Sequence, residues 1–124
     1  MKKFSFLFIL PLLCCHLHLS AQSAVYFCSE TGYYGYCYGS SDAENCAYKN
    51  CLREGGKSPR IIGSVIRRKG YGAIAVGKTA NGGNAIGAVG GQSTQEQADL
   101  LAKNYCIQYG GQSPYIDARF FDRQ

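Results

Sequence analysis

The segment Cys51-Leu-Arg-Glu-Gly-Gly-Lys-Ser-Pro59 follows the pattern C-x3-G-G-x-S-P, and Cys106-Ile-Gln-Tyr-Gly-Gly-Gln-Ser-Pro114 repeats that pattern 55 residues later. In both places a stretch with alanines at helical spacing leads into the cysteine. Glycine readily takes the left-handed conformation that ends a helix, so each Gly-Gly pair predicts a helix terminus. The residue before a proline favours an extended conformation, so each Ser-Pro predicts an extended path after the helix. The sequence therefore predicts two helices that end in the same way.

The similarity between the two parts of the chain extends beyond this pattern. Segment 24–28 aligns with 73–77, and segment 34–39 aligns with 86–91. Because a solenoid needs more than two units, we interpret the chain as one duplicated domain, with copy one at 24–69 and copy two at 70–121. The spacing A-x3-A-x3-C also occurs twice, each time on one helical face: Ala43, Ala47 and Cys51, then Ala98, Ala102 and Cys106.

Each copy is expected to form strand, turn, strand, helix and strand. The helices are expected to run to about Glu54 and Tyr109, with Ser41 and Ser93 as N-caps and a capping box between Ser93 and Glu96. The expected fold is α+β, with an antiparallel-rich sheet of about six strands and two helices on one face. The predicted strands are 23–29, 34–39 and 60–68 in copy one, and 71–78, 85–90 and 115–121 in copy two.

Residues 1–21 have the pattern of a secretory signal peptide. Lys2 and Lys3 give a basic start, a mostly apolar run follows, and the small residue Ala21 precedes polar sequence. The apolar run is too short to cross a bilayer as a helix. We therefore expect a secreted or periplasmic protein with a single mature domain at 22–124 and no membrane span after cleavage.

The expected mature chain has no histidine, because His16 and His18 both lie in the leader. Cys–His and Ser–His–Asp sites are therefore excluded, and a Ser–Lys or carboxylate pair is the remaining catalytic alternative. We expect no enzymatic activity, no catalytic residues, no cofactor and no metal site. The net charge of +5 falls to +3 without Lys2 and Lys3, which is too weak to indicate nucleic acid binding.

Residues 72–79 match the phosphate-binding pattern G-x4-G-K-T. The four variable residues are apolar and predict a strand, whereas a phosphate-binding loop bends there and is followed by a helix. The sequence Ala80-Asn-Gly-Gly83 predicts a turn instead. We therefore expect no nucleotide binding.

Five cysteines remain after removal of the leader, and in an exported domain of this size they predict disulfides. Five cannot all pair within one chain, and several arrangements remain open. The disulfide candidates are Cys28, Cys37, Cys46 and Cys51, with pairing concentrated among the first three. We expect Cys106 to be a free thiol in the core.

Tyrosines are concentrated in copy one. Tyr34, Tyr36 and Tyr38 alternate, so they share one face of a predicted strand. One interpretation is a packed aromatic face, and the other is a partner-binding surface, since tyrosine supplies large amphipathic contact at low entropic cost. We take these three residues as the candidate partner-binding residues.

The paired strands, the A-x3-A-x3-C helix and the Gly-Gly pair, each present twice, resemble the DUF4189 family of small secreted bacterial domains. The resemblance covers about residues 24–121. Many members of that family carry a further cysteine soon after the Gly-Gly pair, where this chain has Ser58 and Ser113. The family's disulfide pattern therefore does not transfer, and the resemblance implies no catalytic residue because the function of the family is unassigned.

These observations predict an exported protein-interaction module that binds a protein partner. Inhibitors and immunity-type proteins are examples of this class. The alternative is a module that binds cell-envelope glycan through the tyrosine face. An enzyme is the third hypothesis, and it would need its site in a cleft between the two copies.

Overall fold

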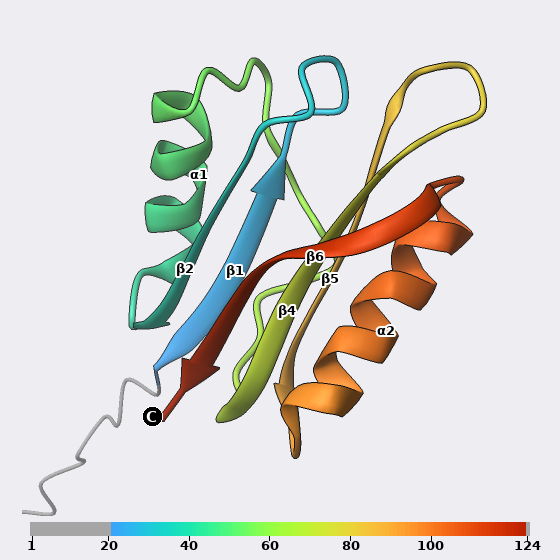
Figure 1. Cartoon of the computed structure of the whole chain (residues 1–124). Coiled ribbons are helices and arrows are strands. Elements are labelled where there is room, and N and C mark those ends of the chain that lie inside the picture. Colours follow the sequence, from blue (N-terminus) through green and yellow to red (C-terminus); the bar gives the residue numbers. More distant parts are fainter. Residues whose placement is uncertain (1–20, 124) are drawn as a thin grey trace, which may run out of the picture.

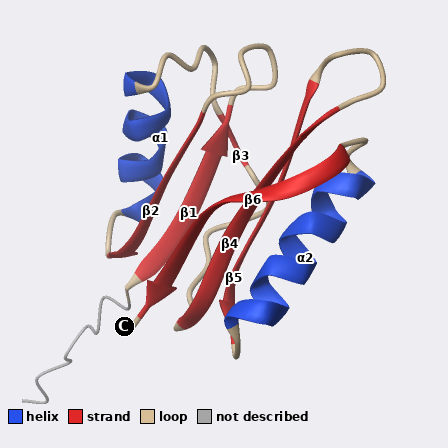
Figure 2. Ribbon diagram, in the orientation of Figure 1, coloured by secondary structure: helices blue, strands red, loops and turns tan. Residues whose placement is uncertain are grey.

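The computed structural model describes residues 21–123, so the predicted signal peptide lies outside the described residues apart from Ala21 (Figure 1). Within this range no helix is both long and apolar enough to cross a membrane. The chain alternates strand pairs with helices (Figure 2). The elements are β1 (Gln22–Phe27), β2 (Tyr34–Ser40), α1 (Ala43–Arg53), β3 (Arg60–Ile61), β4 (Gly70–Lys78), β5 (Asn84–Gln92), α2 (Gln95–Gln108) and β6 (Gln112–Asp122).

The α+β class is confirmed, but the prediction of a single sheet is wrong. The strands form two three-stranded antiparallel sheets, in the orders β2-β1-β3 and β5-β4-β6. In each sheet the central strand, β1 or β4, has both edges occupied by strands from its own part of the chain. A strand pairs through only two edges, so neither central strand can join the other sheet.

The two helices lie on opposite sides of the molecule, so the prediction of two helices on one face is also wrong (Figure 1). Helix α1 packs on β1 and β2, and α2 packs on β4, β5 and β6. The sheet faces away from the helices pack together around Val25, Ile74, Ile86 and Phe120. Because side chains alternate along a strand, Ala73 and Ala75 face α2 while Ile74 faces the other sheet. The order of layers is helix, sheet, sheet and helix.

Small residues let each helix lie directly on its sheet, as the alanine spacing predicts. The Ala and Cys residues of both A-x3-A-x3-C rows are fully buried. A Cβ atom on Gly35 would lie 2.2 Å from the backbone nitrogen of Cys51, and one on Gly87 would lie 2.0 Å from the Ala102 carbonyl oxygen. Only glycine permits this backbone approach.

Both helices end as the Gly-Gly pairs predict. The amides of Gly55 and Gly56 donate to the carbonyl groups of Leu52 and Cys51, and those of Gly110 and Gly111 donate equivalently in α2. Gly55 and Gly110 have φ of 101° and 90°, so each helix ends in a Schellman motif. A Cβ atom on the second glycine would lie only 2.7 Å from the Cys51 sulfur in α1 and 2.5 Å from that of Cys106 in α2.

Two local predictions near the helix ends are wrong. The N-caps are Asp42 and Thr94, one residue later than predicted, and the Thr94 hydroxyl accepts a hydrogen bond from the Gln97 amide, so the predicted capping box does not form. Ser58 and Ser113 take positive φ values of 50° and 46° rather than an extended conformation. The tight return after each Schellman motif overrides the usual preference of a residue before proline.

The predicted strand at 60–68 forms only in part. Residues Arg60 and Ile61 pair with β1, and the chain then turns away at Gly63, whose φ is 65°. It returns at Ile66, which makes an isolated antiparallel bridge with Ser23. The glycine interrupts the strand because it allows a conformation that leaves the sheet.

Candidate binding cleft

A cleft of about 950 Å³ lies between the two sheets and is lined by both parts of the chain. Tyrosine, amide, carboxylate and basic side chains line its walls together with a few aliphatic groups. The lining residues that carry rings or polar groups are Phe27, Thr31, Tyr33, Tyr34, Tyr36, Asn50, Arg53, Glu54, Lys78, Asn84, Gln112, Ser113, Tyr115 and Asp117.

A side-chain hydrogen bond joins β2 on one wall of the cleft to β6 on the other. The Tyr34 hydroxyl on β2 donates to the Asp117 carboxylate on β6. Burial, together with this hydrogen bond to an anion, raises the pKa of Tyr34 above its ordinary value. Tyr34 therefore stays protonated at neutral pH and acts as a fixed donor.

The three predicted partner-binding tyrosines occupy different positions. Tyr34 and Tyr36 are partly buried against the core between the sheets, and both line the cleft. Tyr38 is 50% exposed and lies outside the cleft lining, where it stacks on Phe120 at a ring distance of 5.5 Å. Tyr36 stacks on the same phenylalanine at 5.9 Å. These three tyrosines thus form a packed aromatic face, and Tyr34 and Tyr36 also contribute to one wall of the cleft.

Other residues of the cleft were not singled out from the sequence. Tyr33 and Tyr115 are 49% and 59% exposed, so their rings offer more free surface than Tyr34 or Tyr36. Tyr115 directly follows the second Ser-Pro, so the repeated pattern was an available signal for it. Asp117 carried no such signal, because only the packing of the two sheets brings it to Tyr34.

Polar groups in the cleft differ in how firmly they are held. The Lys78 ammonium group donates to the Asn84 side-chain oxygen at 2.6 Å, and the Asn84 amide donates to the Ser29 carbonyl at 3.2 Å. Within residues 21–123, the exposed side chains of Arg53 and Glu54 make no hydrogen bond or ion pair. The cleft therefore presents a free cation and a free anion beside an ordered amide network.

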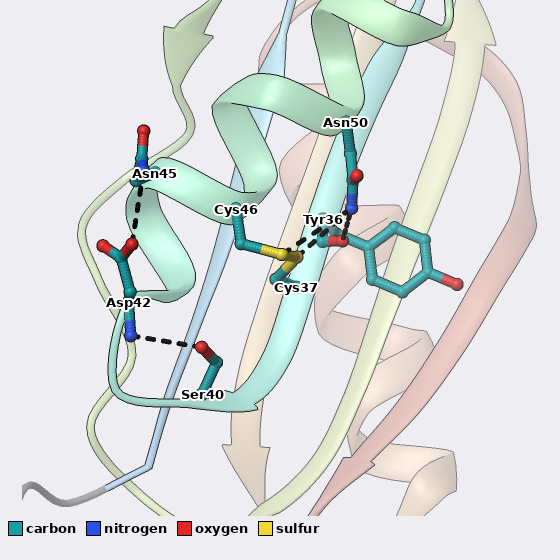
Figure 3. Close-up of a disulfide and its surroundings, with 7 residues drawn as sticks. All are labelled: Tyr36, Cys37, Ser40, Asp42, Asn45, Cys46 and Asn50. Carbon is teal, nitrogen blue, oxygen red and sulfur yellow. Dashed lines mark hydrogen bonds between the residues drawn. A yellow bond between two sulfur atoms is a disulfide. The ribbon is translucent and has the colours of Figure 1, made fainter.

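A disulfide between Cys37 and Cys46 lies next to the cleft residues Tyr36 and Asn50 (Figure 3). It joins β2 to α1 with the two Cα atoms 5.9 Å apart. The Asn50 amide next to it donates to the Tyr36 carbonyl oxygen at 3.1 Å and to Cys37 at 3.2 Å. This bridge confirms pairing between two of the four predicted candidates, while Cys28, Cys51 and Cys106 are buried thiols.

The segment that matches the phosphate-binding pattern is a strand, as expected. Residues 70–78 form β4, and a turn rather than a helix follows at Thr79. In the described part of the chain, no group of three or more His, Cys, Asp or Glu residues is placed to hold a metal ion.

Comparison of the chain with protein-family models, with curated proteins and with solved structures gives no match. The cleft is therefore interpreted from its own chemistry.

Proposed function

We propose that this protein is an exported interaction module that binds a protein partner in the cleft between its sheets, without catalysis. The observation that carries this proposal is the gathering of four tyrosine rings, Tyr33, Tyr34, Tyr36 and Tyr115, in one cleft. Tyrosine is enriched at protein interfaces because its rigid ring buries a large area while its hydroxyl remains able to hydrogen bond.

The charges of the cleft support a polypeptide as the occupant. Within the described residues, the side chains of Arg53 and Glu54 have no partner of opposite charge, and the Gln112 side-chain amide can pair with backbone groups of an extended segment. Such mixed charge favours selectivity for one sequence over general adhesion. Inhibitors and immunity-type proteins, which block a partner by inserting into or covering it, fit this proposal.

Glycan binding is the second candidate. Tyrosine rings with neighbouring amide and carboxylate groups also suit sugar rings and their hydroxyl groups. The specific observation in its favour is that Asn84 and Asp117 lie in the same cleft as the exposed rings of Tyr33 and Tyr115.

We also propose that the chain is a duplicated strand–strand–helix–strand unit, related to the DUF4189 domains and exported through residues 1–21. Three pairs of positions at the predicted repeat spacing have matching environments: Gly35 and Gly87 under the helices, Gly56 and Gly111 against a cysteine sulfur, and Ser58 and Ser113 with positive φ. The Cys37–Cys46 disulfide is consistent with an oxidising compartment.

A capture experiment with matched variants tests the binding proposal. Oxidised protein would be immobilised and exposed to envelope and culture-medium extracts of the source cells. The variant Tyr33→Ser/Tyr115→Ser changes two exposed rings of the cleft, and Tyr109→Ser is the control, because Tyr109 is 64% exposed and lies outside the cleft lining. Binding of the captured protein would then be measured with both components purified.

The expected result is one stoichiometric protein that is lost with the cleft variant and kept with the control. Retention of envelope polysaccharide, with competition by soluble fragments of it, would select the glycan candidate. Equal capture by both variants would contradict any role of the cleft.

A further inference from the structure

Cys28 and Cys51 both donate a hydrogen bond to one peptide carbonyl group. The Cys28 amide donates to the Tyr33 carbonyl oxygen at 2.9 Å, and the Cys51 thiol donates to the same oxygen at 3.7 Å. Cys28 directly follows β1, and Cys51 lies in the last turns of α1. Both side chains are buried, at 2% and 0% exposure.

The loop after α1 lies against both cysteine side chains. The Cys28 thiol donates to the Lys57 carbonyl oxygen at 2.7 Å and accepts from the Lys57 amide at 3.3 Å. The residue before Lys57 is Gly56, where a Cβ atom would lie 2.7 Å from the Cys51 sulfur. The two cysteines therefore flank the same short segment of backbone.

The second part of the chain shows the geometry of this contact. Gly77 stands there in place of Cys28 and Cys106 in place of Cys51. A Cβ atom on Gly77 would lie 3.4 Å from the Cys106 sulfur, and 3.1 Å and 3.5 Å from the carbonyl oxygen and amide of Gln112. In the first part of the chain, the Cys28 sulfur contacts the equivalent backbone groups, the carbonyl oxygen and the amide of Lys57. In a disulfide, the Cβ atom of one cysteine lies about 3 Å from the sulfur of the other, so this arrangement needs only a small adjustment.

We propose that Cys28 and Cys51 form a second disulfide when the protein meets a thiol-oxidising disulfide, either a small molecule or a protein. Cys28 lines a surface hollow of about 500 Å³ with Lys57, Ser58 and Arg60, whereas Cys51 is absent from that lining, so Cys28 lies nearer to an oxidant in solution.

The exchange takes place in two steps. The Cys28 thiolate attacks one sulfur of the oxidant, whose disulfide breaks and releases a first thiol. The Cys51 thiolate then attacks the Cys28 sulfur of the mixed disulfide, which forms the Cys28–Cys51 bond and releases a second thiol. Two electrons and the two thiol protons pass to the oxidant, which leaves as two thiols.

The directions of the two pKa shifts favour Cys28 as the thiol that attacks the oxidant first. Hydrogen bonds from Thr31 and from backbone groups lower the pKa of Cys28, whereas burial raises the pKa of Cys51. The Cys28–Cys51 disulfide would link the end of α1 to β1, while the Cys37–Cys46 disulfide links the beginning of α1 to β2. Helix α1 would then be cross-linked at both ends, and Cys106 would remain a thiol because Gly77 offers it no partner.

Peptide mapping of the full chain tests this proposal. Protein exported from cells would be incubated with oxidised glutathione, blocked with N-ethylmaleimide under denaturing conditions, and digested without reduction by trypsin and a glutamate-specific protease. Cleavage after Glu30, Glu44, Lys49 and Arg53 places Cys28, Cys37, Cys46 and Cys51 on separate peptides.

The expected result is the peptide 50–53 linked to the peptide that ends at Glu30, beside the Cys37–Cys46 link. Cys28→Ser should release 50–53 as a maleimide adduct, while Cys106→Ser should leave the link unchanged. Circular dichroism spectra that match the unsubstituted protein show that each variant has folded. Recovery of 50–53 as a maleimide adduct from the unsubstituted protein, or its linkage to a Cys37 or Cys46 peptide, would overturn the proposal.

Discussion

The hydroxyl group of Tyr34 on β2 donates a hydrogen bond to the Asp117 carboxylate on β6, so this side-chain contact joins the two sheets along the cleft. The two residues are 83 positions apart in the chain. The contact sets the position of a cleft tyrosine and also links the two parts of the fold.

Tyr34→Phe should therefore lower the stability of the fold. The variant keeps the packing of the ring but removes a hydrogen bond to a charged group, which typically contributes about 1.5–3 kcal/mol. Urea denaturation followed by circular dichroism measures the change in free energy of unfolding. Tyr33→Phe is the matched control, because the Tyr33 ring also lines the cleft but its hydroxyl makes no hydrogen bond within the described residues. Equal effects of the two substitutions would contradict the role of the Tyr34–Asp117 contact.

The same contact predicts a loss of stability at alkaline pH. The pKa of Tyr34 is raised in the folded state above its ordinary value of 10.0, first by burial and then by Asp117. Below pH 10 both folded and unfolded states hold the proton, and the contribution is fully present. As the pH rises above about 10, the unfolded state releases the proton first, so the contribution is lost progressively. The difference in urea midpoint between the unsubstituted protein and Tyr34→Phe should shrink between about pH 10 and 11.5. A constant difference across that interval would contradict the assignment.

Gly77→Cys should create a disulfide in the second part of the chain. The new Cβ atom would lie 3.4 Å from the Cys106 sulfur, and the closed loop would stabilise the fold by about 3.6 kcal/mol in the chain-entropy account. Oxidation with glutathione, followed by maleimide counting and urea denaturation, measures both effects. Gly82→Cys is the control for the maleimide count, since a Cβ atom there meets nothing within 4 Å. The reduced form of Gly77→Cys is the control for urea denaturation, because φ of 81° at Gly82 would strain any side chain. If the introduced thiol and that of Cys106 both stayed free after oxidation, the geometry argued for Cys28 and Cys51 would be incorrect.

Gly111→Ala should destabilise the protein because its Cβ atom would lie 2.5 Å from the Cys106 sulfur. Forcing extra volume into such a contact costs about 1–3 kcal/mol. Cys106→Ala removes the sulfur, so the same glycine substitution should cost less in that background. A double-mutant cycle of urea midpoints measures the coupling. Additive effects would mean that the sulfur is not what requires glycine at this position.

Several features could be predicted from the sequence because they depend on neighbouring residues. The buried rows of Ala43, Ala47 and Cys51 and of Ala98, Ala102 and Cys106 follow from helical periodicity. The Schellman motifs follow from Gly-Gly directly after the last helical turns. The second N-cap was misplaced by one residue because Ser and Thr stand side by side at 93 and 94, and both can accept a hydrogen bond.

The candidate site was predicted only in part. Alternation placed Tyr34, Tyr36 and Tyr38 on one face, but it did not separate the two that line the cleft from Tyr38, which stacks outside it. The opposite wall contains Tyr115 and Asp117, and no sequence pattern places these two residues beside the tyrosines of β2.

The sequence by itself determined the element types and the close contact of each helix with its strands, because periodicity, small side chains and glycine conformations act over a few residues. Only the tertiary structure decided that the strands divide into two sheets, that the helices lie on opposite sides and that a cleft opens between the sheets. Strand edges and apolar faces can be satisfied by more than one partner, and the choice depends on which faces of distant segments bury the most apolar surface together.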